Sequence, residues 1–175
     1  ECTGAIVQEV EALKNLVDEF AQFARLPAAN LKPSSLHEVV EQALSLYDGL
    51  FTGVTIARRF APDLPSVRLD PDQMKRVLIN LVDNAIEATE KKGTVTVSTE
   101  FDGGEGQVRL GVADDGPGIP PEDRDRLFVP SFSTKRRGSG LGLAIVSRIV
   151  QEHQGTIRVE ENRPRGTRFV VELPV

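Results

Sequence analysis

The strongest constraint on the fold comes from two neighbouring segments in which apolar and polar residues alternate, TVTVS at 94–98 and QVRLGVAD at 107–114. Alternation with a period of two is typical of a strand that buries one face. The glycine-rich stretch DGGEG at 102–106 favours a hairpin turn between them. Two further strands, at 156–161 and 167–173, are joined by the turn NRPRG. The sequence therefore predicts antiparallel strand pairs in a sheet with one solvent-exposed face.

Helical patterns lie between these strand pairs. The clearest begins at Asp70, a favoured N-cap, with Pro71 at the first helical position and Gln73 completing a capping-box arrangement. We expect this helix to run to about Lys91 and to be stopped by Gly93. Other helices are expected at 35–51 and 141–154, and short strands at 54–60 and 66–69. The fold class is α+β: a two-layer α/β sandwich with a mixed, largely antiparallel sheet, preceded by one long N-terminal helix.

That N-terminal helix is expected over residues 3–25. Its apolar residues are spaced by alternating fours and threes, at Ile6, Val10, Leu13, Val17, Phe20 and Ala24. Leu16 and Phe23 widen the stripe, which favours packing in a helical bundle. The alternative is a helix that packs against its own domain. The following RLPAANLKPSS indicates a linker that ends in a helix cap at Ser34 or Ser35, so we divide the chain into 1–33 and 34–175.

The composition and charge exclude several kinds of site and partner. Cys2 is the only cysteine, which excludes an intrachain disulfide and a cysteine-built metal site. The net charge of −5 argues against nucleic acid as a partner. No apolar run approaches the roughly 20 residues of a membrane span, so we expect this segment to be soluble and cytoplasmic and to make no membrane contact. The chain begins at Glu1, which suggests a fragment of a longer protein that could itself be membrane-anchored.

Three motifs carry candidate chemistry. Asn80 and Asn84 lie on one flank of the capped helix, where amide oxygens can ligate Mg²⁺ and amide hydrogens can meet phosphates, although such pairs are more often solvated or capping. Asp114 ends a strand in VADDGPGIP, where the glycines turn its carboxylate toward a pocket. Gly138, Gly140 and Gly142 precede a helix N-terminus beside Lys135, which favours an anion site under a mobile lid. Their spacing fits neither a dinucleotide-binding fingerprint nor a P-loop.

The order of the motifs is more specific than any one of them. Asn-x-x-x-Asn, Asp-x-Gly-x-Gly, the paired Phe128 and Phe132, Gly-x-Gly-x-Gly-Leu and the late Gly-Thr together resemble the ATP-binding domain of sensor histidine kinases over residues 35–175. The segment IVQEVEALKNLVDEFAQFARLP is similar to the second helix of the dimerisation domain of these kinases, particularly of nitrogen-regulation-type sensors.

This resemblance implies a Bergerat-type sandwich that binds Mg-ATP. It assigns Asn84 to the Mg²⁺ ion, Asn80 to the phosphates and Asp114 to the adenine amine. It places Gly116, Gly118, Ile119 and Thr167 around the adenine, and Lys135, Gly138, Gly140, Leu141, Gly142 and Leu143 in or beside the lid. The implied partners are ATP or ADP, the histidine-bearing dimerisation helix of the same kinase, a response regulator, and a second copy of this chain through residues 3–25.

Transfer to a protein histidine is favoured over hydrolysis, because related gyrase, mismatch-repair and chaperone ATPases carry a glutamate base where this chain has Asn80. An amide cannot accept a proton at neutral pH. His37 and His153 are the only histidines, and we expect His37 to have a surface or capping role and His153 to lie at a helix end. We therefore expect the acceptor histidine to lie outside this chain and assign no catalytic residue within it. A nucleotide-responsive interaction module and an ATPase remain alternatives.

Overall fold

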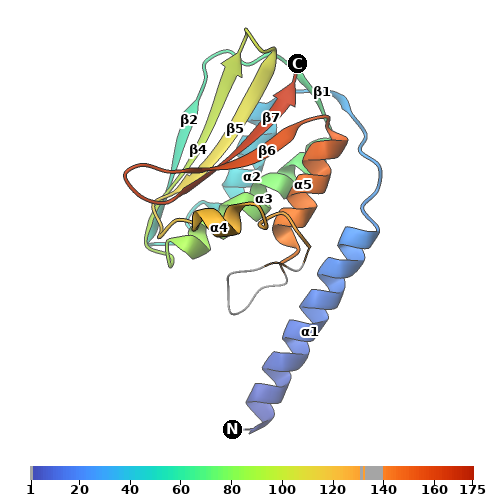
Figure 1. Ribbon diagram of the computed structural model, residues 1–175, viewed down its shortest axis with the longest axis vertical. Coiled ribbons are helices and arrows are strands. Elements are labelled where there is room, and N and C mark those ends of the chain that lie inside the picture. The colour runs from blue at the N-terminus through green and yellow to red at the C-terminus, as the bar shows by residue number, and fades with distance from the viewer. Residues whose placement is uncertain (1, 131, 133–139) are drawn as a thin grey trace.

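The structure is a computed structural model that describes residues 2–130, 132 and 140–175, without the side chains of residues 2 and 3. Its elements follow the expected order closely (Figure 1). They are α1 (Cys2–Ala24), β1 (Lys32–Ser34), α2 (Leu36–Leu44), the 3-10 turn η1 (Ser45–Tyr47), β2 (Val54–Phe60), β3 (Val67–Leu69), α3 (Pro71–Ala88), β4 (Gly93–Asp102), β5 (Gln107–Asp114), α4 (Pro121–Arg124), α5 (Gly142–Glu152), β6 (Thr156–Glu161) and β7 (Thr167–Pro174).

Five of the strands form one sheet in the order β2-β4-β5-β7-β6. The β2–β4 pair is parallel and the other three pairs are antiparallel. Helices α2, α3 and α5 cover one face of this sheet (Figure 1). The two-layer arrangement and the mixed, largely antiparallel sheet are therefore confirmed.

The core lies between this face of the sheet and the helices. Met74 and Leu81 of α3 are fully buried, as are Val95, Val97 and Leu110 of the sheet. The burial alternates along β4, as the sequence pattern requires. This packing holds α3 and the ends of the strands in fixed register.

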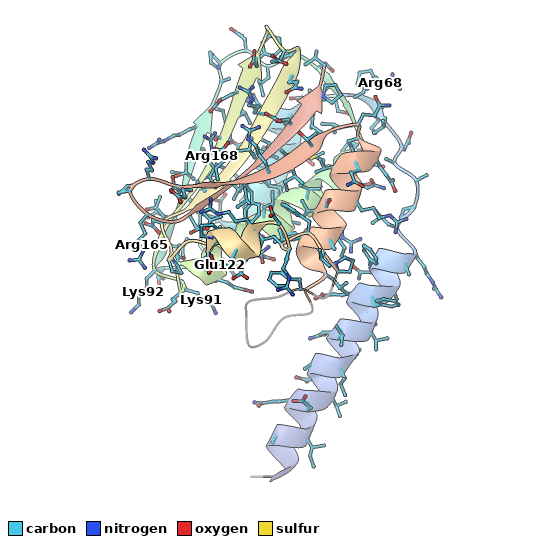
Figure 2. All side chains as sticks on the ribbon, viewed as in Figure 1. Arg68, Lys91, Lys92, Glu122, Arg165 and Arg168 are labelled. Carbon is cyan, nitrogen blue, oxygen red and sulfur yellow. The ribbon has the colours of Figure 1, made fainter. Side chains whose placement is uncertain are left out.

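The opposite face of the sheet carries charged side chains. Arg109 pairs with Asp102 at 2.8 Å and with Glu172 at 3.1 Å. Arg168, labelled in Figure 2, pairs with Glu100 at 3.2 Å on the same face. The predicted solvent-exposed face is thus confirmed, and cross-strand ion pairs line it.

Three helix ends differ from the prediction. The second helix gives way to η1 after Leu44 instead of continuing to 51, and α5 ends at Glu152. Helix α3 ends at Ala88, because the Lys91 amide donates to the Ile86 carbonyl at 3.2 Å and Glu90 donates to Glu87 at 2.9 Å. These two hydrogen bonds form a Schellman motif, with Glu90 in the left-handed region at φ 52°. Gly93 therefore begins β4 and does not stop the helix.

The N-cap of α3 is built from two parts of the chain. Oδ1 of Asp70 accepts from the amides of Asp72 and Gln73, each at 3.1 Å, as expected. The Gln73 side chain does not return to Asp70 as a capping box would require. Instead, the Asp70 amide donates to Nε2 of His153 at 2.9 Å. His153 is 2% exposed and its Nδ1 donates to the Ile149 carbonyl, so it is a buried link between α5 and α3.

The other histidine packs against the sheet. Nε2 of His37 lies 2.8 Å from Oγ1 of Thr99, and its ring stacks on Phe60 with centroids 5.2 Å apart. Ser35 caps α2, since its side chain accepts from the Glu38 amide. His37 is therefore half-buried and does not cap α2, because its ring packs on Phe60 and hydrogen-bonds with Thr99.

Residues 26–31, which we call the strap, are bound to the helices and are not a loose linker. Nε2 of Gln73 donates to the Pro27 carbonyl at 2.8 Å. The Ala29 amide donates to Glu152 at 3.3 Å, and the Asn30 amide donates to Asp70 at 2.9 Å. β1 then pairs with β3. The sequence indicated only prolines and small residues here, so these long-range bonds were not predictable from it.

Helix α1 projects away from the sheet and its helices (Figure 1). Its apolar stripe is exposed, with Ile6 at 62%, Val17 at 64% and Phe20 at 60%. Near its C-terminal end, Nη1 of Arg148 donates to the Phe23 carbonyl at 2.7 Å. The exposed stripe does not fit the alternative of a helix packed along its own domain. In the described part of the chain, no helix is both long and apolar enough to cross a membrane.

Candidate nucleotide site

A cavity of about 740 Å³ opens between α3, α5, the end of β5 and the start of β7. The last turns of α1 also reach it, through Glu19 and Gln22. Its volume is within the range of small-molecule and cofactor sites.

A buried carboxylate marks one end of the cavity. Asp114, the last residue of β5, is 4% exposed. Its Oδ1 accepts from the Gly116 amide at 2.9 Å and from the Thr167 amide at 3.3 Å. Burial raises the pKa of Asp114 above its ordinary value, although these two backbone bonds oppose the shift. Such a group can accept a hydrogen bond from a ligand in a place that water reaches poorly.

The backbone crosses itself tightly behind Asp114. Gly166 has φ 112°, and a Cβ on it would overlap the carbonyl oxygen of Asp114. Nδ2 of Asn162 donates to that same carbonyl at 2.7 Å. Arg165, labelled in Figure 2, donates from Nε to the Gly116 carbonyl at 2.8 Å. The turn before β7 therefore fixes the loop that follows β5.

The walls near Asp114 are apolar. Ile119, Leu127 and Phe169 line this part of the cavity. Phe128 packs edge-on against Phe169, with centroids 6.3 Å apart, and Phe132 lines the cavity itself. A carboxylate among apolar and aromatic walls suits a flat heterocycle with an exocyclic amine.

The other end of the cavity is formed by α3 and the start of α5. Nδ2 of Asn80 donates to the Arg76 carbonyl at 3.1 Å. Gly142 lies against the same side chain, so that a Cβ there would be 3.2 Å from Oδ1 of Asn80. Helix α5 begins at Gly142 with no side-chain cap, and its first residues line the cavity. The N-terminus of a helix favours anions, because its first amides lack intrahelical acceptors.

The described lining is strongly acidic. It contains one cationic side chain, Arg76, and five carboxylates, those of Glu19, Asp83, Glu87, Glu90 and Asp114. Within residues 2–130, 132 and 140–175, no group of three or more His, Cys, Asp or Glu residues could hold a metal ion. A divalent cation would offset this negative charge for a polyphosphate, and the Asn84 amide oxygen is a suitable hard ligand for it.

Most of the expected site residues line this one cavity: Asn80, Asn84, Asp114, Gly118, Ile119, Gly140, Gly142, Leu143 and Thr167. Gly116 acts through its amide, which binds Asp114. Leu141 is buried beneath the site as the N-cap of α5. Lys135 and Gly138 lie outside the described residues. The sequence analysis did not identify Arg76, although its position one turn before Asn80 was a usable signal. It also did not identify the contribution of α1, for which the sequence offers no signal.

Comparisons with known proteins agree with this geometry. Residues 69–175 match the family described as "Histidine kinase-, DNA gyrase B-, and HSP90-like ATPase". The chain is 36% identical to the sensory histidine kinase/phosphatase NtrB of Rhodobacter capsulatus, covering 100% of this chain and 52% of NtrB. The structure of full-length ShkA in complex with AMPPNP aligns with a TM-score of 0.83 at 32% identity, covering 98% of this chain and 37% of ShkA.

The histidine kinase ThkA, solved in complex with the response regulator protein TrrA, aligns with a TM-score of 0.81 at 30% identity. The alignment covers 97% of this chain and 49% of ThkA. The chain thus spans about half the length of NtrB and of ThkA, and less of ShkA.

Proposed function

The chain belongs to the family of histidine kinase-, DNA gyrase B- and HSP90-like ATPases, and from that premise we propose that it is the ATP-binding catalytic part of a sensor histidine kinase. It binds Mg-ATP and transfers the γ-phosphoryl group to a histidine that lies outside this chain. From there the group passes to an aspartate of a response regulator. NtrB and ThkA are named histidine kinases and ShkA was solved in complex with AMPPNP, which supports this proposal.

The observation that supports the proposal most directly is that one cavity has an acceptor for a base at one end and groups for phosphates at the other. Asp114 offers an acceptor for the adenine amine at one end, and Asn80, Asn84 and the start of α5 offer donors and ligands for phosphates at the other. Phosphoryl transfer depends mainly on positioning and charge neutralisation, which such a site supplies. Asn80 cannot serve as a base, because an amide does not accept a proton at neutral pH, which favours transfer over hydrolysis.

The function is tested by adding a two-helix hairpin that carries a histidine followed by an acidic residue, together with ATP labelled at the γ-phosphate. We expect an acid-labile phosphoprotein to accumulate on the hairpin. Tight ATP binding with no phosphoprotein would favour the nucleotide-responsive interaction module instead. Release of phosphate at a rate that the hairpin does not change would favour an ATPase.

The phosphate end should depend on both Mg²⁺ and Asn84. A divalent ion there would neutralise phosphate charge in a lining that is otherwise acidic. We expect ATP to bind about tenfold more weakly without Mg²⁺, and Asn84→Ala to remove most of that difference. Titration calorimetry with and without the metal measures both effects. Asn15→Ala, an exposed position on α1, is the matched control, and an equal response of both variants would contradict the assignment.

We further assign residues 1–33 to a dimerisation unit that also includes a partner helix carrying the histidine. The exposed stripe on α1 supports self-association, because an apolar seam of this length is costly to leave in water. Sedimentation equilibrium should show a dimer, and Val17→Lys should weaken it. Asp18→Lys, off the seam, should not. A concentration-independent monomer mass for the unaltered chain would refute the assignment.

A further inference from the structure

Arg76 joins the phosphate end of the cavity to α1. It lies on α3, one turn before Asn80, and its carbonyl accepts from Nδ2 of that asparagine at 3.1 Å. Its own Nη2 donates to Oε1 of Gln22 at 2.8 Å. Arg76 and Gln22 both line the cavity. Arg76 therefore contacts Asn80 through its backbone carbonyl and the last turns of α1 through its side chain.

Arg76 is a part-buried cation in a cavity whose described lining is acidic. Burial lowers the pKa of the guanidinium, and the charge of Glu19 partly offsets this effect. Its hydrogen-bond partner on α1 is a neutral amide. Among the described lining residues it is the one cation in a cavity with five carboxylates. A phosphate group, with two or more oxygens in one plane of the guanidinium, is a stronger partner than an amide.

We propose that α1 and the nucleotide compete for Arg76, which donates to Gln22 in the arrangement seen here and pairs with a β- or γ-phosphate when a nucleoside triphosphate is bound. This inference rests on the proposed function, because it takes the ligand to be ATP. By thermodynamic linkage, docking of the last turns of α1 weakens triphosphate binding, and the triphosphate weakens that docking by the same factor. Adenosine, which has no phosphate, is not coupled to α1.

The strap limits the effect of losing the contact between Arg76 and Gln22 to the end of α1. Asp70, Gln73 and Glu152 bind residues 27–30 independently of Arg76, so losing the Gln22 contact does not free the whole connection. The contact between Arg148 and the Phe23 carbonyl is also separate from the cavity lining. The competition thus alters how firmly the end of α1 is held while its attachment is kept.

The test compares Gln22→Ala with Gln8→Ala, the same substitution at an exposed site far along α1. Titration calorimetry with a non-hydrolysable ATP analogue and with adenosine measures the two affinities. We expect Gln22→Ala to bind the analogue about threefold to tenfold more tightly and adenosine unchanged, since one hydrogen bond no longer competes. Gln8→Ala should match the unaltered chain for both ligands.

Arg76→Gln completes the cycle. It should weaken binding of the analogue about tenfold and leave adenosine unaffected, and Gln22→Ala should have no further effect in its background. If the chain binds both ligands but Gln22→Ala behaves like Gln8→Ala, or weakens the analogue, the competition is refuted while the nucleotide site stands. If the unaltered chain binds neither ligand, the proposed function fails and this inference fails with it. Thermal unfolding of each variant checks that folding is retained.

Discussion

Replacing Gly166 with alanine is expected to lower the free energy of unfolding by about 3 kcal/mol or more. Two costs add at this position. The backbone has φ 112°, which residues with a Cβ rarely adopt, and the new Cβ would overlap the carbonyl oxygen of Asp114. The neighbouring atoms are backbone, so no side-chain rotation relieves the overlap. Denaturant unfolding followed by circular dichroism measures the change.

Gly106 provides the matched control for this prediction. It also has positive φ, at 64°, but nothing lies within 4 Å of a Cβ built on it. Gly106→Ala should therefore lower the free energy of unfolding by only about 1 kcal/mol, the cost of a left-handed alanine. Equal losses in the two variants would show that the crossing behind Asp114 is looser than described.

Replacing Asp114 with asparagine should weaken ATP binding about 100-fold. The amide keeps an oxygen for the Gly116 and Thr167 amides but can turn an NH₂ group toward the adenine amine, where two donors would face each other. Titration calorimetry measures the loss. Asp115→Asn is the control, because Asp115 is exposed and accepts from the Thr94 amide. If both variants bind ATP as the unaltered chain does, Asp114 does not contact the base.

The same substitution should change how the stability of the protein depends on pH. Burial raises the pKa of Asp114 in the folded state, so the carboxyl favours folding below its unfolded pKa and this contribution is lost as pH rises through the folded pKa. Asparagine has no such loss. The free energy of unfolding of Asp114→Asn relative to the unaltered chain should thus rise from acid to neutral pH, which denaturant unfolding at several pH values would reveal. A constant difference would contradict the direction of the pKa shift.

Local patterns predicted the elements well because each depends on neighbouring residues. Alternation identified β4 and β5, and Asp70 with Pro71 identified the start of α3. The error at Gly93 has a local cause as well. Glu90 adopts the left-handed conformation that glycine usually supplies, and no sequence rule marks a glutamate for that role.

Contacts between distant segments were the part that the sequence could not predict. The bond between Arg76 and Gln22 joins residues 54 positions apart, and the bond between Asp70 and His153 joins residues 83 positions apart. Each arises from packing that only the folded chain defines. Asn80, Asn84 and Asp114 line one cavity, as the motifs predicted. The part of the cavity wall that α1 contributes could be identified only from the structure.

The strap also determines how force would pass along this chain. A hinge would absorb a rotation of α1 about its long axis, but residues 27–30 are bound to Gln73 and to Asp70 and Glu152, at the N-cap of α3 and the last turn of α5. Torque applied to α1 is therefore delivered to the ends of two helices that also line the cavity. In mechanical terms the connection is a stiff coupling.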